Sequence, residues 1–214
     1  MSRMIAEIQT YIQDRIAETN TIPEIRKTEL KQLAGFIERQ LQDKKIPQLI
    51  FICTHNSRRS HLSQIWAHAA AYFYGIPEVT TFSGGTEATA FNYRAVAAVG
   101  NAGFQIEKTT DGDNPVYLVR YAADAHPLKC FSKKYSDPFN PQDNFCAIMT
   151  CSDADEACPI VFGAAERITI RYNDPKAFDD TEQETEKYDE RCRQIAREML
   201  FAFSQITVPQ NKKE

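Results

Sequence analysis

The segment from Pro47 to Ser60, PQLIFICTHNSRRS, is the sequence feature that most constrains the fold. Its apolar and β-favouring run Leu49-Ile50-Phe51-Ile52 ends at Cys53 and predicts a buried strand. The stretch that follows, HLSQIWAHAAAYFYG, has apolar residues near helical spacing and predicts a helix over about 60–75. A strand that enters a helix through a short polar loop is typical of α/β folds with a parallel sheet.

The loop between this strand and this helix has the composition of an oxyanion-binding site. Backbone N–H groups that point inward at a helix start, together with the helix dipole, favour a tetrahedral anion. Arg59 can offer the anion a bidentate fork, and Asn56 tolerates the left-handed backbone of a tight loop. The same field favours the thiolate of Cys53, a candidate nucleophile that Ser60 is placed to hydrogen-bond. The expected oxyanion-binding residues are Thr54, His55, Asn56, Ser57, Arg58 and Arg59.

Length and composition restrict the class of protein. The chain has 214 residues, of which 43% are hydrophobic, which fits one domain with an appendage or two small domains. A net charge of −4, spread along the chain, argues against a nucleic-acid-binding or membrane-surface protein. No apolar run reaches the roughly 18–20 residues of a membrane span, and the N-terminus lacks the features of a secretory signal. We therefore expect a cytoplasmic protein whose six cysteines are thiols or redox groups.

The first 44 residues predict a helical extension. Apolar residues fall on one face of a helix over 3–18, and a second helix is predicted from about Pro23 to Asp43. We interpret 1–44 as a helical hairpin that serves as a packing appendage, an oligomer surface or a specific binding element. The main domain is expected at 45–207 and a polar tail at 208–214.

Strands and helices alternate in the main domain, which predicts an α/β fold with a four-stranded parallel sheet flanked by helices. Within 112–145, two β-like runs predict an inserted segment resembling a β-hairpin. The further strands of the parallel sheet are predicted at about 79–82, 145–150 and 167–172, the further helices at 92–103 and 181–203, and the two runs at 116–121 and 128–132.

Three chemically useful side chains each follow a predicted strand. They are Cys53, Cys151 and Asp174, and the carboxyl ends of parallel strands meet at the edge of the sheet where ligands bind. Cys158 lies seven residues after Cys151 in the segment CSDADEACP. The remaining cysteines at 130, 146 and 192 lie in no motif and are expected to be packing residues.

Together, these motifs resemble the low-molecular-weight tyrosine phosphatase superfamily, and within it the thioredoxin-coupled arsenate reductases. The resemblance rests on the Cys53 loop, the segment Cys151–Pro159, Asp174-Pro175 and SGGTEATAFNYRAV at 83–96. It spans about 46–206, does not cover the N-terminal helices, and makes 112–145 an insertion.

The resemblance implies a mechanism without an organic cofactor. The thiolate of Cys53 would attack an arsenate or phosphate oxyanion held by the loop and Arg59, with Asp174 as general acid. In a reductase, Cys151 would then form a disulfide with Cys53, and Cys158 would form one with Cys151. Thioredoxin would reduce this last disulfide.

The sequence departs from the family pattern at three positions. His55 replaces a glycine of the loop, and Arg58 replaces its second cysteine; we expect Arg58 to point to solvent. Gln64 replaces a glutamate that helps some reductases to hold potassium, although Asn56 and Ser83 would fit such a site. A potassium ion beside the loop therefore stays an open expectation, and no other metal is expected.

Three interpretations follow from the sequence. A thioredoxin-linked arsenate reductase requires a redox-active Cys151–Cys158 pair. A low-molecular-weight phosphatase would use a Cys53 phosphocysteine and hydrolyse aryl phosphates without thiols. A non-enzymatic anion-binding or redox-sensing module would bind phosphate without turnover.

Overall fold

The centre of the chain is a parallel sheet, seen in the computed structural model, which describes residues 3–76, 78–157 and 160–207. The strand order β2-β1-β6-β7 confirms the predicted fold class. The central strands β1 and β6 are buried on both faces, so their sequences are nearly continuous apolar runs. The strands are β1 (Gln48–Cys53), β2 (Thr80–Gly85), β6 (Phe145–Met149) and β7 (Ala164–Thr169).

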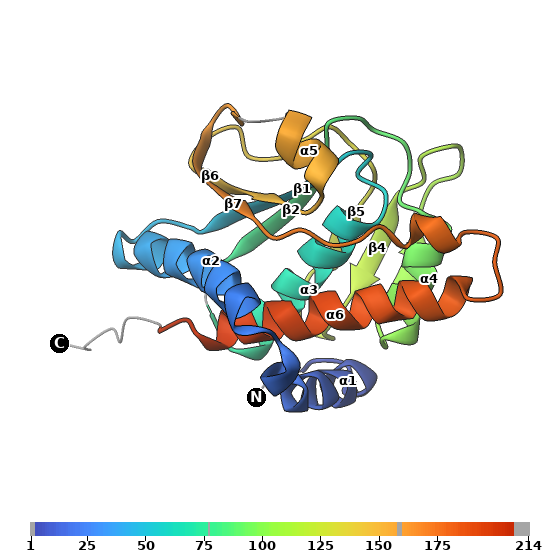
Figure 1. The fold of residues 1–214 in the computed structure, drawn as a ribbon, viewed down its shortest axis with the longest axis horizontal. Coiled ribbons are helices and arrows are strands. Elements are labelled where there is room, and N and C mark those ends of the chain that lie inside the picture. The colour runs from blue at the N-terminus through green and yellow to red at the C-terminus, as the bar shows by residue number, and fades with distance from the viewer. Residues whose placement is uncertain (1–2, 77, 158–159, 208–214) are drawn as a thin grey trace.

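The side chains of β1 alternate between two apolar layers. Leu49 and Phe51 join a large cluster with the main helices, whereas Ile50 and Ile52 join a smaller cluster that includes Ala154 of α5. In the view of Figure 1, α5 lies above the sheet and α6 crosses below it, packed on α3 and α4. These elements are α3 (Arg59–Phe73), α4 (Tyr93–Asn101), α5 (Ser152–Ala157), the 3-10 helix η2 (Pro175–Phe178) and α6 (Glu184–Ser204).

The two N-terminal helices complete the large cluster. Ile8, Ile12, Leu33 and Ile37 are fully buried in it, and α1 and α2 both pack on α6. These elements are α1 (Ala6–Ala17), the 3-10 helix η1 (Thr19–Thr21) and α2 (Glu24–Gln42). The predicted helices are therefore present, and their apolar faces are buried against the same helix that covers the parallel sheet.

A second, antiparallel sheet has the strand order β3-β4-β5. Its strands β4 and β5 are the two β-like runs of the sequence, so the expected hairpin-like pairing is confirmed. Strand β3 was not predicted because Ile106 is its only apolar residue. The strands are β3 (Gln105–Lys108), β4 (Tyr117–Arg120) and β5 (Leu128–Cys130).

The last strand of the parallel sheet begins three residues earlier than the sequence predicts, at 164 instead of 167. The apolar alternation of the sequence starts only at Ile168, whereas Ala164 already pairs with Phe145 of β6. Beyond the end of β7, the backbone of Ile170 still donates to Met149. Among the described residues, no helix is long and apolar enough to cross a membrane.

Candidate active site

The loop between β1 and α3 runs from Cys53, where the strand ends, to Arg59, where the helix begins. Asn56 has a φ of +44° in this loop, which confirms the predicted left-handed backbone. Its fully buried amide donates to Ser60 Oγ at 2.9 Å and accepts from the backbone N–H of Lys133 at 2.9 Å. The side chain of Asn56 therefore fixes the loop to the first turn of α3 and to a distant part of the chain.

The thiol of Cys53 lies at the mouth of this loop and is 3% exposed. Its Sγ is 3.1 Å from Ser60 Oγ, which confirms the expected contact. Because Ser60 Oγ already accepts from Asn56, its own proton is available to be donated to the sulfur. Such a donor stabilises a thiolate more than a thiol, since hydrogen bonds to ionised acceptors are the stronger ones.

Two glycines at the end of β2 allow the loop to pack closely. A Cβ added at Gly85 would lie 2.6 Å from Thr54 O and 2.7 Å from Asn56 N. A Cβ added at Gly84 would lie 2.8 Å from the backbone nitrogen of Tyr135. The glycine pair in SGGTEATAFN therefore lets β2 pack closely on this loop at Gly85 and on Tyr135 at Gly84.

Residues 132–135, which we call the brace, hold the loop through hydrogen bonds. No motif of the sequence marks this segment. Ser132 Oγ donates to the carbonyl of His55 at 3.0 Å, and the backbone of Lys133 donates to Asn56. Gly85 N donates to Lys133 O and Tyr135 N donates to Gly85 O, both at 2.9 Å. The brace falls within the predicted insertion, so this stretch contributes directly to the shape of the loop.

A buried lysine belongs to the brace. The side chain of Lys133 lies over the ring of Phe131 at 4.6 Å, and burial lowers its pKa to about 8. Burial, together with the charge of Lys133, also lowers the pKa of His61 well below its usual range. The brace therefore contains a buried basic side chain, that of Lys133.

Two of the three oxygens that would hold a potassium ion already have protein partners. Asn56 Oδ1 accepts from Lys133, and Ser83 Oγ lies 3.2 Å from His61 Nδ1. The side-chain nitrogen of Gln64 donates to Thr81 O. The Oε1 of Gln64 is buried and has no hydrogen-bond partner among the described residues. The potassium ion beside the loop therefore stays a prediction from the sequence.

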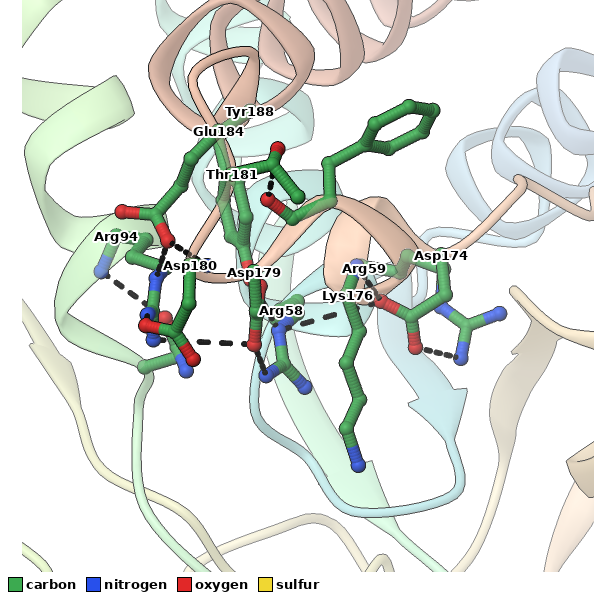
Figure 2. A network of polar contacts seen from close by, with 12 residues as sticks. Arg58, Arg59, Arg94, Asp174, Lys176, Asp179, Asp180, Thr181, Glu184 and Tyr188 are labelled. Atoms are coloured by element: carbon green, nitrogen blue, oxygen red, sulfur yellow. Dashed lines mark hydrogen bonds and ion pairs between the residues drawn. The ribbon is translucent and has the colours of Figure 1, made fainter.

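Arg59 and Asp174 meet at the predicted edge of the sheet. Arg59 Nη2 donates to Asp174 Oδ2 at 2.7 Å, and its Nη1 donates to Tyr172 O at 3.2 Å. Asp174 also caps η2 through the backbone of Lys176 at 3.1 Å. Figure 2 shows the carboxylate of Asp174 pointing at Arg59. The structure therefore brings Asp174 to the loop that contains Cys53.

The side chain of Arg58 is buried against α6, so the expectation that it points to solvent was wrong. It is 11% exposed and donates to Tyr188 Oη at 2.6 Å and to Asp179 Oδ2 at 3.1 Å. Burial and the hydrogen bond to Asp179 raise the pKa of Tyr188 well above its usual value. No local pattern could predict these partners, because both lie more than a hundred residues away in the chain.

Cys151 lies next to the loop on the other side. Its sulfur is 3.5 Å from Thr54 Oγ1 and its side chain is 1% exposed. The segment that follows forms α5, which Asp155 ties to Arg167 and Thr169 of β7 and to Arg171 just beyond this strand. Cys158, the second member of the expected pair, lies outside the described residues.

The remaining predicted loop residues differ in exposure. The side chain of His55 is 42% exposed and lies 3.6 Å from Glu87, whereas Ser57 is buried and its carbonyl accepts from Asn92 N. The other described cysteines are buried packing residues, as expected. Burial raises the pKa of Cys130 and Cys192 to about 12 and that of Cys146 well above its usual range.

Comparisons with known proteins agree with this geometry. No family model matches the chain. An arsenate reductase of Bacillus licheniformis is 28% identical over 158 residues, which are 73% of this chain and 94% of that protein. A mutant of YwlE from Bacillus subtilis superposes with a TM-score of 0.51 at 13% identity, over 74% of this chain and 97% of that one. A low-molecular-weight protein tyrosine phosphatase from T. tengcongensis gives a TM-score of 0.50 at 14% identity, over 75% and 99%.

Proposed function

We propose that the chain is a member of the low-molecular-weight tyrosine phosphatase superfamily and, within it, an arsenate reductase of the thioredoxin-coupled type; its fold and its similarity to an arsenate reductase support this proposal. The observation that carries this proposal is the position of Cys151, whose sulfur is 3.5 Å from Thr54 in the oxyanion loop. A phosphatase needs only the first thiol, whereas a reductase needs a second thiol within reach of it.

The first chemical step uses the loop. The thiolate of Cys53 attacks the arsenic of arsenate, which is held by loop N–H groups and by Arg59. Asp174 gives its proton to the oxygen that leaves as water. The product is an adduct in which the sulfur of Cys53 is bound to As(V).

The second step transfers two electrons. The thiolate of Cys151 attacks the sulfur of Cys53, and the electron pair of the S–As bond passes to arsenic, which leaves as As(III) in arsenite. The two sulfurs are then joined in a disulfide. The thiolate of Cys158 attacks Cys151 and releases Cys53, and the dithiol of thioredoxin reduces the Cys151–Cys158 disulfide and is itself oxidised.

This relay requires α5 to change shape. As an uninterrupted helix, two cysteines seven residues apart lie about 10 Å apart, whereas a disulfide needs Cα atoms within roughly 7 Å. The contacts of Asp155 with Arg167, Thr169 and Arg171 help to hold α5 against the end of the sheet, so we expect them to loosen during each cycle.

A phosphatase is the second candidate. The pairing of Arg59 with Asp174 at 2.7 Å gathers an oxyanion ligand and a general acid at one loop, which also suits phosphoester hydrolysis. Water would then take the place of Cys151 and cleave a Cys53 phosphocysteine.

The deciding experiment is arsenate-dependent oxidation of reduced thioredoxin by the wild type, Cys151→Ser and Cys158→Ser, with Cys146→Ala as a thiol-removing control. A reductase turns over as wild type and as Cys146→Ala, and stops after at most one event in the other two variants. No turnover of arsenate, together with hydrolysis of an aryl phosphate that survives Cys158→Ser but not Cys53→Ser, would support the phosphatase instead.

A further inference from the structure

Arg58 connects the oxyanion loop to the segment that contains Asp174. It immediately precedes Arg59, and its Nε donates to Tyr188 Oη at 2.6 Å while its Nη2 donates to Asp179 Oδ2 at 3.1 Å. The same Nε lies 4.0 Å from Asp174 Oδ1. Figure 2 shows Arg58 between the two carboxylates.

Asp179 is held by both of its oxygens. Tyr188, which is 1% exposed, donates to Oδ1 at 2.6 Å, and Arg58 donates to Oδ2. Arg94 adds a contact of 3.7 Å to the same carboxylate and pairs with Asp180 at 2.6 Å. The far end of η2 is therefore fixed to α6 and α4.

The near end of η2 depends on Arg59. Asp174 caps η2, and its Oδ2 accepts from Arg59 Nη2 at 2.7 Å. The other terminal nitrogen of Arg59 donates to Tyr172 O. Arg59 Nε is buried and has no hydrogen-bond partner among the described residues, so an oxyanion that takes Nε and Nη2 as a fork would share Nη2 with Asp174 and compete with that carboxylate.

Among the described residues, the carboxylate of Asp174 forms ion pairs with two cations, Arg59 at 2.7 Å and Arg58 at 4.0 Å. The guanidinium of Arg58 needs no large movement to pair with Asp174, because its Nε is already 4.0 Å from Asp174 Oδ1. Since the single Nε–H is donated to Tyr188, the new contact is an ion pair and not a hydrogen bond from Nε. Tyr188 and Asp179 keep the guanidinium in place while the carboxylate changes partner. The geometry points to an exchange in which Asp174 passes from one arginine to its neighbour.

We propose that Arg58 is a positioning residue that receives the Asp174 carboxylate when a tetrahedral oxyanion occupies Arg59. The exchange keeps the side chain of Asp174 at the loop and compensates the carboxylate for the loss of its first ion pair. The inference rests on the proposed function only in taking Arg59 as the oxyanion ligand, and it holds for arsenate and phosphoester chemistry alike.

The test is a double-mutant cycle on the affinity for inorganic phosphate, measured by titration calorimetry with the full chain. In the wild-type background, Arg58→Met leaves the displaced carboxylate without a cation and should weaken phosphate binding about fivefold. In the Asp174→Asn background no carboxylate needs a new partner, so the same change should cost less than about twofold. Arg94→Met, which removes a cation that does not approach Asp174, is the control and should stay within about twofold of the wild type.

Equal losses in the two backgrounds would make Arg58 a direct ligand of the anion and overturn the exchange. If Arg58→Met weakens phosphate binding in neither background, the exchange is overturned as well. Arg58→Lys keeps a charge at this position and should recover part of the affinity, and it serves as the test variant if Arg58→Met does not fold. A wild-type chain that binds no phosphate would overturn this inference together with the oxyanion site, whereas failure to oxidise thioredoxin alone would overturn only the reductase.

Discussion

Arg59 and Asp174, 115 residues apart in the chain, are joined by a hydrogen bond of 2.7 Å between Nη2 and Oδ2. The residue expected to hold the oxyanion and the residue expected to protonate its leaving oxygen are thus each other's partners. In the proposed mechanism, binding and proton transfer would be coupled through this ion pair, since the anion and the carboxylate would use the same guanidinium.

Replacing Asp174 by asparagine should separate these two roles. Without the competing charge at Arg59, phosphate should bind about three- to tenfold more tightly, and without the general acid kcat should fall about 10²- to 10⁴-fold. Calorimetric titration and steady-state rates measure the two effects. Asp137→Asn is the matched control, because Asp137 is also followed by proline and caps the backbone of Phe139. A loss of kcat in Asp137→Asn that equals the loss in Asp174→Asn would contradict the assignment.

Ser60→Ala should make Cys53 less reactive. The change removes the hydroxyl that lies 3.1 Å from the sulfur and also removes the acceptor for Asn56. Since hydrogen bonds to charged groups contribute about 1.5–3 kcal/mol, alkylation of Cys53 by iodoacetamide at pH 7 should slow at least about tenfold. Mass spectrometry of the Cys53 peptide measures this rate.

Ser63→Ala provides the comparison for Ser60→Ala. Ser63 is fully buried one turn further along α3, and its hydroxyl has no hydrogen-bond partner within the described part of the chain. Its removal should leave the alkylation rate of Cys53 within about twofold of the wild type. Equal slowing in both variants would mean that the effect comes from the helix and not from the contact with sulfur.

Gly85→Ala should destabilise the fold and distort the loop. The added methyl group would meet the backbone of Thr54 at 2.6 Å and that of Asn56 at 2.7 Å, where no flexible side chain can give way. We expect a loss of about 3 kcal/mol or more in the free energy of unfolding, measured by urea denaturation.

Gly100→Ala tests the same substitution where space is open. An added Cβ has no atom within 4 Å at this position in α4, so alanine should stabilise the protein by up to about 1 kcal/mol. If both variants lost stability to the same degree, close packing at Gly85 would not be the cause.

His68 should make the protein less stable in mild acid. Its Nε2 lies 2.9 Å from Tyr121 Oη, and burial lowers its pKa from 6.5 to about 4. Below about pH 6.5 the imidazole of His68 binds a proton in the unfolded chain but stays neutral in the folded chain. The free energy of unfolding therefore falls with pH until about pH 4, where the folded chain binds the proton as well. The shift corresponds to a loss of up to about 3 kcal/mol. His61 acts in the same direction, because burial and the charge of Lys133 lower its pKa as well.

Urea denaturation of wild type, His68→Gln and His126→Gln between pH 7 and 4 checks this prediction. His68→Gln should show a shallower fall in stability than the wild type, because it removes one of the groups that take up a proton on unfolding. His126 is exposed, so its replacement should leave the slope unchanged. Parallel curves for the wild type and His68→Gln would contradict the assignment.

The sequence predicted those parts of the fold that local pattern specifies. The apolar run before Cys53, the left-handed Asn56 and the contact of Ser60 with the sulfur all follow from residues within one short segment. Asp174 was expected at the loop because parallel strands place their carboxyl ends at a common edge, and its contact with Arg59 agrees with that.

What the sequence could not predict depends on contacts between distant segments. Ser132 carries no motif, yet its hydroxyl holds the carbonyl of His55, 77 residues away. Arg58 was expected in solvent because a charged residue at a helix start usually is, and only the fold brings Tyr188 and Asp179 to it. Strand β3 has a single apolar residue, so pairing with β4 and not its own composition defines it.

The brace also has a consequence for the order in which the protein acquires its chemistry during synthesis. The ribosome makes Cys53 early, but the groups that support its loop come from Ser132 and Lys133. A nascent chain that ends before residue 132 contains the thiol without the supports that shape its anion site. The loop around Cys53 can therefore take its final shape only after Ser132 and Lys133 have been translated.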